Sequence, residues 1–477
     1  MTEKQHNKNF VLEGKGLQLN GLWDWLAHPV PVAIDKGVRP KMEASRKVVE
    51  DCLKDGRPHY GINTGFGSLA NTVIPSNKLD ELQENLVRSH ACGVGGLFER
   101  DIVRLIMLLR ANVLAMGYSG VRYELLEYLV DYINKGSVPR IPSQGSVGAS
   151  GDLAPLAHLA LALLEGGLKL APKEGLALIN GVQASLAVAV IALRDVSLLF
   201  HHANTAAALS VEGLRGSDRP FDAKIANIRP QEGHGKVSAI IRDMLAGSEI
   251  VSSHKNCSRV QDPYSLRCVP QVHGAVMDAC EYARNVIEKE LASCTDNPLI
   301  FGNDVVSGGN FHGTSIALVC DHLSSAFTVL GNISERRIEQ MINPKQGELP
   351  VRYLIKDAGL NSGFMVAHVV ASALASENKA LSFPASADSI TTSGGQEDFV
   401  SMAMWAARKL AQVVSNVQKI IAIELLAAAQ AIDMQEERKQ PGVGTKKMYD
   451  AIRKHIPVVE TDREMYKDIE KMLELMK

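Results

Sequence analysis

Apolar residues along the chain recur mostly with the spacing of helices. Such spacing marks residues 82–129, 153–164 and 173–199, and it is clearest over 401–433. The i, i+3, i+4, i+7 stripe of that last stretch consists of Leu410, Val413, Val414, Val417, Ile420 and Ile421, and it continues to Glu424. The alternation typical of strands is nearly absent, and short pieces such as 298–301 are the ones that favour a strand. The pattern predicts an almost all-helical protein.

The hydrophobic pattern also changes along the chain. A proline-marked break at 28–31 interrupts the first helices, and beyond the turn at 217–220 the helical periods become long and rich in alanine. Long helices of this kind pack into bundles, and their small residues allow close contacts between copies. We therefore predict a mainly α fold: a long-helix bundle over 201–477 and a smaller α-rich N-terminal domain over 1–200, with a homo-oligomer built on the bundle.

Composition excludes several classes of protein. The formal net charge is -2 and no long basic run occurs, so neither nucleic acid nor a membrane surface is an expected partner. No run reaches eighteen apolar residues, and the first ten residues are polar, which predicts a cytoplasmic protein. The seven cysteines form no CxxC pair, and neither HExxH nor a P-loop occurs. These features predict reduced thiols and neither a metal nor a nucleotide cofactor.

One stretch combines small residues with possible chemistry, namely 145–158, GSVGASGDLAPLAH. It predicts a loop that enters a helix, with Asp152 as N-cap and Pro155 in the first turn. Backbone N–H groups and the positive end of the helix dipole would then point at the preceding tripeptide. On three residues alone, a cap and a turn are the commoner explanation of Ala-Ser-Gly.

The same tripeptide offers a second possibility, because Ala149 and Gly151 carry almost no side chain. A strained loop can bring the Gly151 amide nitrogen onto the Ala149 carbonyl carbon and close a five-membered ring. Loss of water from the ring and from the Ser150 hydroxyl would leave an exocyclic methylidene. Such a group is an electrophile, which the ordinary side chains do not provide.

The whole run 145–158 resembles the signature of the aromatic amino acid ammonia-lyases. Their built-in cofactor is a methylidene-imidazolone (MIO) formed from Ala-Ser-Gly. The resemblance covers nearly the whole chain, and its other motifs are Tyr60–Gly67, Asn180-Gly181, Gln261–Cys268, Ser307–His312 and Gln396-Glu397-Asp398. It implies an MIO made from Ala149, Ser150 and Gly151, no metal or nucleotide, and a homotetramer with shared active sites.

The resemblance also implies a role for each site residue. Tyr60 would be the base for the β-proton, provided that the site lowers its pKa. Asn180 and the backbone N–H groups near Gly151 and Asp152 would stabilise negative charge on the ring. Arg267 would bind the substrate carboxylate through two parallel hydrogen bonds. The residues implied to line the pocket around the amine and the ring are Tyr264, Gln261 and Phe311.

Within the family, the lyases that act on L-histidine fit best. Their imidazole partners match His90 and Glu397, and each buried ring nitrogen left without a partner would cost roughly 1–3 kcal/mol. The implied products are trans-urocanate and ammonium. Phe399 and Gly394-Gly395 depart from the histidine-lyase pattern. Two alternatives therefore remain: a tyrosine or phenylalanine ammonia-lyase or aminomutase with the same cofactor, and an inactive helical scaffold.

Overall fold

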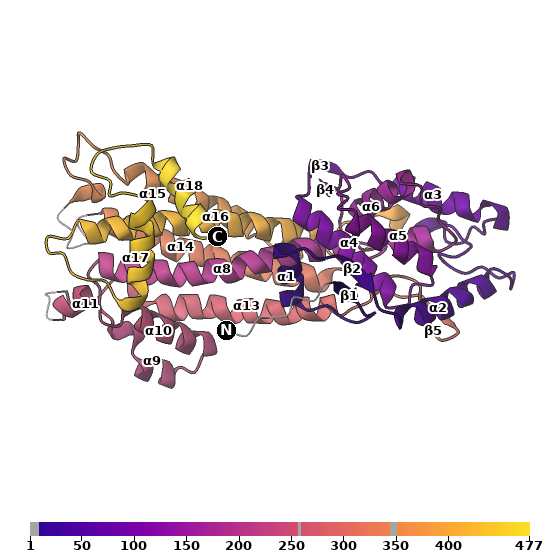
Figure 1. The fold of residues 1–477 in the computed structure, drawn as a ribbon, viewed down its shortest axis with the longest axis horizontal. Helices are drawn as coiled ribbons and strands as arrows, with labels where there is room; N and C mark the ends of the chain where they lie inside the picture. The colour runs from indigo at the N-terminus through magenta and orange to yellow at the C-terminus, as the bar shows by residue number, and fades with distance from the viewer. Residues whose placement is uncertain (1–8, 256–258, 344–350) are drawn as a thin grey trace. The chain divides into compact units, whose positions relative to one another are not determined.

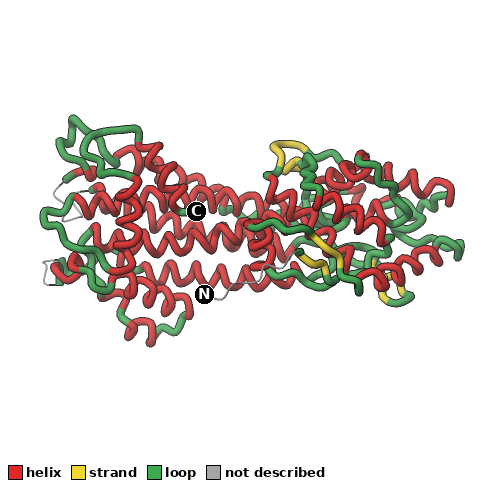
Figure 2. The backbone as a smooth tube through the Cα atoms, in the orientation of Figure 1, coloured by secondary structure: helices red, strands yellow, loops and turns green. Residues whose placement is uncertain are grey.

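The computed structural model describes residues 9–255, 259–343 and 351–477, and it confirms the mainly α fold (Figures 1 and 2). Contacts divide the chain into two compact units. Unit 1 comprises residues 1–191, 284–321 and 384–408, and unit 2 comprises 192–283, 322–383 and 409–477. Each compact unit combines three separate segments of the chain, and such units are not the same thing as domains. The predicted contiguous domains, 1–200 and 201–477, therefore stay a prediction. Residues 1–8, which contribute to the cytoplasmic prediction, lie outside the described residues.

Unit 1 is built mainly from helices of moderate length. They are α1 (Leu19–Ala27), α2 (Val38–Cys52), α3 (Leu79–His90), α4 (Arg100–Ala115), α5 (Tyr123–Asn134), α6 (Leu153–Glu165) and α7 (Glu174–Ile179), with short 3-10 turns at Gly67–Leu69, Ser76–Lys78 and Ser393–Gly395. Helix α4 is buried continuously from Leu105 to Ala115 and lies in the core of the unit. The buried stretch is mostly apolar, with Arg110 and Asn112 as buried polar exceptions.

Short strands pair within unit 1. Among the described residues the pairs are β1 (Phe10–Leu12) with β2 (Val32–Ile34), β3 (Val94–Leu97) with β4 (Pro142–Gln144), and β5 (Leu299–Phe301) with β6 (Asp304–Val306). The first pair is parallel and the other two are antiparallel. Strand β5 confirms the strand expected at 298–301. Ile300 of β5 packs with Val49, Cys52 and Ile62 in one small cluster of the core.

Unit 2 contains the predicted bundle. Four long helices contribute residues to both units: α8 (Gln183–Gly213), α13 (Val269–Leu291), α14 (Thr314–Ile342) and α16 (Ala403–Asp433). The other helices of unit 2 are α9 (Ala223–Ile228), α10 (Glu232–Leu245), α11 (Glu249–Ser253), α12 (Tyr264–Arg267), α15 (Met365–Leu381), α17 (Val443–His455) and α18 (Met465–Leu475), with 3-10 turns at Arg219–Phe221 and Arg352–Leu354. The apolar stripe predicted on α16 is buried throughout.

A buried carboxylate links three of the long helices. Glu424 of α16 accepts hydrogen bonds from Arg337 of α14 at 2.5 and 2.9 Å and from Ser210 of α8 at 2.6 Å. Both charged side chains are fully buried. The ion pair and the serine hydrogen bond together connect α8, α14 and α16 inside unit 2.

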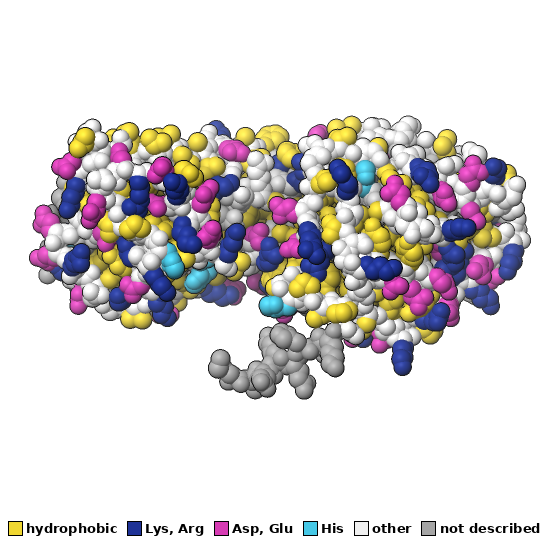
Figure 3. All heavy atoms as spheres, turned by 45° about the horizontal axis from the view of Figure 1, so that its top comes forward, with side chains coloured by type: hydrophobic (Ala, Val, Ile, Leu, Met, Phe, Trp, Pro, Cys, Tyr) yellow, Lys and Arg dark blue, Asp and Glu magenta, His cyan; other side chains and the backbone are white. Residues whose placement is uncertain are grey.

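Three described stretches are long and apolar enough to cross a membrane by length and composition alone: Glu174–Gly213, Thr314–Ile342 and Ala403–Asp433. The sequence analysis, which looked for uninterrupted apolar runs, does not identify them. Within the fold, 94%, 67% and 72% of their most apolar windows are buried, so packing accounts for much of their apolar character. On the face seen in Figure 3, Lys and Arg side chains are interspersed with Asp and Glu. The expected absence of membrane and nucleic-acid partners stays a prediction.

Candidate active site

The loop ahead of α6 is anchored by a buried carboxylate. Helix α6 begins directly after Asp152 and has Pro155 in its first turn, as predicted, but the Asp152 side chain makes no capping hydrogen bond. Instead it accepts hydrogen bonds from Ser146 Oγ at 2.9 Å and from Ser185 N and Oγ at 2.7 and 2.8 Å. Burial raises the pKa of this carboxyl group. Asp152 thus occupies the predicted N-cap position, while its carboxylate bonds to Ser185 of α8 rather than to the N–H groups of its own helix.

Gly151 sits against the backbone of Gly181. Its φ is +75°, and a Cβ at this position would lie 2.4 Å from the Gly181 carbonyl oxygen, so any residue larger than glycine is excluded. The N–H of Asp152 donates to that same oxygen at 2.7 Å. The sequence analysis assigns this N–H to the negative charge of a ring, but the structure shows that Gly181 already occupies it.

Ser150 is held at both of its polar ends. Asn180 Nδ2 donates to the Ser150 carbonyl oxygen at 2.9 Å, and the Ser150 hydroxyl donates to Glu397 Oε1 at 2.7 Å. Asn180 is the residue at which α7 ends, and Glu397 comes from a loop more than two hundred residues away along the chain. The structure therefore brings three of the predicted site residues into direct contact.

The Glu397 carboxylate is fixed by a turn that needs glycine. Gly394 and Gly395 both have positive φ, +62° and +92°, and this turn returns the chain so that Thr392 and Glu397 pair through their backbones. The hydroxyls of Thr392 and Ser393 donate to Glu397 Oε2 at 2.7 and 2.6 Å. Burial opposes ionisation, yet these hydrogen bonds and that from Ser150 hold the pKa of Glu397 below its usual value. The carboxylate is thus charged at neutral pH.

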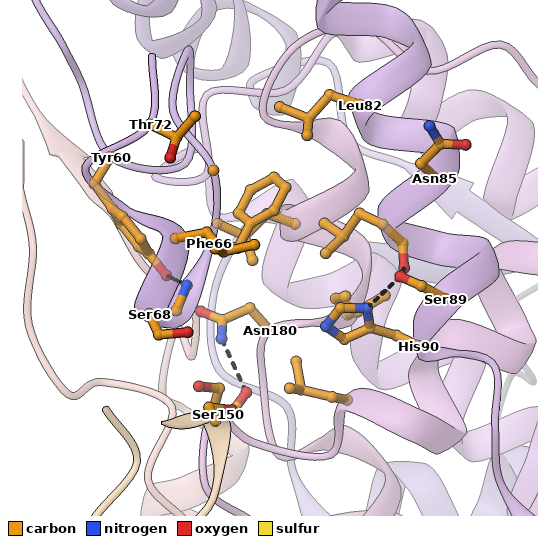
Figure 4. A pocket seen from close by; sticks show the side chains of 18 of the residues that line it. Tyr60, Phe66, Ser68, Thr72, Leu82, Asn85, Ser89, His90, Ser150 and Asn180 are labelled. Atoms are coloured by element: carbon orange, nitrogen blue, oxygen red, sulfur yellow. Dashed lines mark hydrogen bonds between the residues drawn. The ribbon is translucent and has the colours of Figure 1, made fainter. Parts of the chain in front are cut away.

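These residues border a cavity of about 550 Å³ within unit 1 (Figure 4). Its walls are Tyr60, Gly65, Phe66, Gly67, Ser68, Leu69, Thr72, Ile74, Leu82, Asn85, Leu86, Ser89, His90, Ser150, Leu153, Leu176, Ile179, Asn180, Ser393 and Glu397. The lining combines apolar side chains with a few polar groups, which is the usual composition of a small-molecule site. Tyr60, His90, Ser150, Asn180 and Glu397 all face one space, as the sequence analysis expects.

His90 presents one ring nitrogen to the cavity. Its Nδ1 lies 3.0 Å from Ser89 Oγ, and Figure 4 shows the other nitrogen on the side of Asn180. The Ser89 hydroxyl in turn donates to the Leu86 carbonyl at 3.1 Å, so its oxygen is available to accept from Nδ1–H. Burial lowers the pKa of His90, although Glu397 favours its charged form. A neutral ring with a hydrogen-bond acceptor toward the cavity is the result.

Tyr60 differs from its expected state. Its hydroxyl accepts a hydrogen bond from the backbone N–H of Gly67 at 3.4 Å. Burial raises its pKa, the hydrogen bond from Gly67 lowers it, and the negative charge of Glu397 raises it, so that the net shift is upward. A base for the β-proton requires the opposite shift, a lowered pKa. Within unit 1 the groups around Tyr60 therefore do not by themselves make it a base.

Six predicted site residues do not line this cavity, and two of them, Ala149 and Gly151, flank Ser150 in the loop. Phe311 belongs to unit 1 but is not part of the cavity wall, and Gln261, Tyr264 and Arg267 belong to unit 2. The Arg267 guanidinium lies 4.5 Å from the centre of the Tyr264 ring, and Tyr264 is 70% exposed. The site assembled inside unit 1 accordingly lacks the cation expected for a substrate carboxylate.

The structure also identifies site residues that sequence reasoning missed. Ser185 anchors Asp152, and Thr392 and Ser393 orient Glu397. Single serines and threonines carry no local signal of such roles, because their partners are decided by the fold rather than by spacing along the chain. The two adjacent glycines at 394 and 395 were a usable signal of a tight turn next to Glu397.

Comparison with known proteins decides the family. The family model described as aromatic amino acid lyase matches residues 17–168 and 165–454. The chain belongs to the aromatic amino acid lyase family. Membership makes it a carbon–nitrogen lyase.

Individual relatives of this lyase are similar over almost their full length. The chain is 46% identical to a histidine ammonia-lyase of Treponema denticola, over 98% of this chain and 97% of that protein, and 46% identical to one of Sorangium cellulosum over the same shares. The crystal structure of histidine ammonia-lyase from Trypanosoma cruzi is 40% identical, with a TM-score of 0.89 over 98% of this chain and 93% of that chain. A tyrosine aminomutase from Streptomyces globisporus is 36% identical, with a TM-score of 0.90 over 98% and 96%.

Proposed function

We propose that this lyase removes ammonia from L-histidine to give trans-urocanate, using an MIO ring made from Ala149, Ser150 and Gly151. The observation that carries the proposal is the double hold on Ser150, whose carbonyl contacts Asn180 and whose hydroxyl contacts Glu397. A serine in an ordinary turn does not need both partners. The names of the similar histidine ammonia-lyases support the choice of substrate.

The tripeptide fits the ring that the family implies. Gly151 is in a left-handed conformation against Gly181, where a side chain has no space, and Ala149 is buried. When formed, the ring supplies an electrophilic carbon, derived from Ser150 Cβ, to the amine of the substrate. Asn180 Nδ2 already donates to the Ser150 carbonyl oxygen, so a preorganised donor lies where negative charge would collect.

His90 and Glu397 support an imidazole as the side chain of the substrate. The half-buried ring of His90 offers a hydrogen-bond acceptor to the cavity. The ionised Glu397, from a distant segment of the chain, offers a second acceptor. An imidazole N–H satisfies such an acceptor, whereas a phenyl ring leaves it without a partner at a cost of roughly 1–3 kcal/mol. This chemistry favours histidine over phenylalanine.

Tyr60 is the proposed base for the β-proton. It lines the cavity together with Ser150, and it is the first residue of the Tyr60–Gly67 motif. Because burial raises the pKa of its hydroxyl, we propose that the positive ammonium of a bound substrate favours its ionised form. Proton removal is thereby confined to the occupied site.

Gln261, Tyr264 and Arg267 are proposed to act from another copy of the chain, within a homotetramer whose active sites are shared. Tyr264 is largely exposed, Gln261 is exposed, and neither lines the Ser150 cavity. A guanidinium from a neighbouring copy would supply the bidentate partner that the substrate carboxylate requires. Five described cysteines, Cys52, Cys92, Cys268, Cys280 and Cys294, are free thiols, which supports a cytoplasmic location for the assembly.

Shared sites predict complementation between two inactive variants. Ser150→Ala and Arg267→Leu are each expected to be inactive alone, since one lacks the electrophile and the other lacks the carboxylate partner. Mixed by co-expression, they are expected to regain activity, because some sites then combine an intact Ser150 with an intact Arg267. Activity of the purified mixture is the measurement. A mixture that forms mixed oligomers yet stays as inactive as its parts would contradict sharing.

A substrate panel tests the proposed function. The purified chain is offered L-histidine, L-tyrosine and L-phenylalanine, and the products are followed by ultraviolet absorbance and chromatography. We expect urocanate and ammonium from histidine, with kcat/KM on the order of 100-fold lower for phenylalanine, which leaves the His90 and Glu397 acceptors unpaired. Failure to turn over histidine, with product from tyrosine, would overturn the assignment.

The second candidate is a tyrosine lyase or aminomutase with the same cofactor. The similar TM-scores of 0.89 and 0.90 to the histidine ammonia-lyase and the tyrosine aminomutase mean that the fold alone does not separate them. A tyrosine hydroxyl can also donate to His90 or Glu397. In the same panel, a β-amino acid as product would identify an aminomutase, because that reaction returns the amine to the β-carbon.

A further inference from the structure

Asn180 is carried by a short helix that lies entirely inside unit 1. Every residue of α7 (Glu174–Ile179) is buried, and Asn180 follows at its end. Lys173, immediately before the helix, is fully buried with a left-handed φ of +77°, and its Nζ lies 3.0 Å from Asp296. The segment that supplies the Ser150 partner is therefore fixed at its start by a buried charge.

A second buried cation lies at the other end of this segment. Arg110 of α4 is fully buried, and its Nη1 donates to Gln183 Oε1 at 2.8 Å, to the Thr295 carbonyl at 3.1 Å and to the Asn180 carbonyl at 3.5 Å. A Cβ on Gly181 would lie 2.4 Å from the same nitrogen. Arg110 thus packs directly behind the Asn180-Gly181 peptide.

The other side of the Asn180-Gly181 peptide contacts the loop that contains Ser150. Asn180 Nδ2 reaches the Ser150 carbonyl, and the Gly181 carbonyl accepts from Asp152 N and excludes a side chain at Gly151. One peptide unit consequently separates the guanidinium from Ser150 and Gly151. A displacement of Arg110 would be transmitted to the tripeptide without contact with the substrate.

Stability alone explains Arg110 poorly. Its Nε and Nη2 are buried without a hydrogen-bond partner in the described part of the chain, and Nη2 is 3.9 Å from Asp296, which Lys173 approaches more closely. Removing a guanidinium from water costs several kcal/mol when its donors are incompletely paired. A cation retained under these conditions, next to an active-site peptide, indicates a role in the site.

We infer that Arg110 is a positioning residue for the lyase reaction, which holds Asn180-Gly181 against Ser150 and Gly151. The inference rests on the proposed MIO chemistry. It predicts that a cation with fewer hydrogen-bond donors at position 110 slows the chemical steps at the ring. The cavity that binds the substrate should keep its shape, because Arg110 does not line it.

Arg110→Lys and Arg122→Lys form a matched pair for the test. Arg122 also fixes α7, through Nε and Nη2 hydrogen bonds of 2.8 and 2.6 Å to Glu174, but at the end away from Asn180. For each variant, kcat and KM are measured per chain that has lost two waters from the Ser150 peptide, together with Tm. We expect Arg110→Lys to lower kcat roughly 100-fold with little change in KM, since small misplacements near the reacting atoms have effects of this size. Arg122→Lys should lower Tm and leave kcat unchanged.

A wild-type kcat in Arg110→Lys, or an equal loss of kcat in Arg122→Lys, would overturn the inference. If Arg110→Lys does not fold, the Gln183→Glu variant takes its place. A carboxylate at position 183 attracts the Arg110 guanidinium and so competes with the Asn180 carbonyl for it. The Thr295 hydroxyl can still hydrogen-bond to the new carboxylate. A lower kcat with unchanged KM supports the inference, and an unchanged kcat refutes it. A wild-type peptide that has lost no water would instead refute the proposed function.

Discussion

Ser150→Ala is expected to abolish turnover of L-histidine while the chain still folds. The substitution removes the hydroxyl whose loss creates the electrophile, so the amine would have to leave without covalent activation. We expect kcat to fall on the order of 10⁴-fold or more, as it does when other enzymes lose their covalent catalyst. Urocanate formation at saturating histidine is the measurement.

The stability of the same variant separates chemistry from folding. Ser150 lies in a loop and is half-buried, and its hydroxyl makes one hydrogen bond, to Glu397. In the mature protein the proposed ring has already lost this hydroxyl, so the free energy of unfolding of the variant is expected to lie within about 1 kcal/mol of that of the wild type. Ser143→Ala, on the strand just before the loop, is the control and should keep full activity. Substantial turnover by Ser150→Ala would remove the ring from the mechanism.

Glu397→Gln is expected to have the second-largest effect. The ionised carboxylate accepts hydrogen bonds from Thr392 and Ser393, which remain after ring formation, and it lines the cavity, whereas an amide keeps the shape, loses the charge and offers a single acceptor oxygen. We expect kcat/KM for L-histidine to fall roughly 30- to 1000-fold, which corresponds to about 2–4 kcal/mol, the usual loss when a buried charged hydrogen-bond partner is removed. Kinetics with L-histidine across neutral pH give the measurement.

Asp398→Asn provides the matched control. It removes a negative charge at the next position, but Asp398 is exposed and does not line the cavity. Its kcat/KM should stay close to that of the wild type. If kcat/KM fell equally in the two variants, the net charge of this segment would matter rather than a contact between Glu397 and the substrate. The assignment of Glu397 would then fail.

The helical framework was readable from the sequence because burial leaves a periodic record. The stripe on α16 and the small strand β5 were confirmed, and α6 begins where the Asp152 position predicts. Residues 60, 90, 150, 180 and 397 come from separate segments, and it was the family resemblance, rather than periodicity, that predicted their meeting. The structure confirms that they line one cavity.

The hydrogen-bond partners and pKa shifts of the site residues could not be predicted from the sequence, because they depend on neighbours that the fold brings close. The direction of the Asp152 carboxylate is decided by Ser185, and the N–H of Asp152 is occupied by the carbonyl of Gly181. The upward shift in the pKa of Tyr60 comes from burial together with Glu397. Hydrogen-bond competition and desolvation have no signature in a linear pattern, so the partners of Asp152 and the pKa shift of Tyr60 could not be predicted from it.

The most direct test is the mass of the peptide containing Ala149, Ser150 and Gly151, taken from active wild-type protein. The proposed cofactor requires a mass lower by two water molecules than the sequence specifies, and the Ser150→Ala peptide should not show that loss. A full-mass, unmodified Ser150 peptide from protein that converts histidine to urocanate would contradict the central claim.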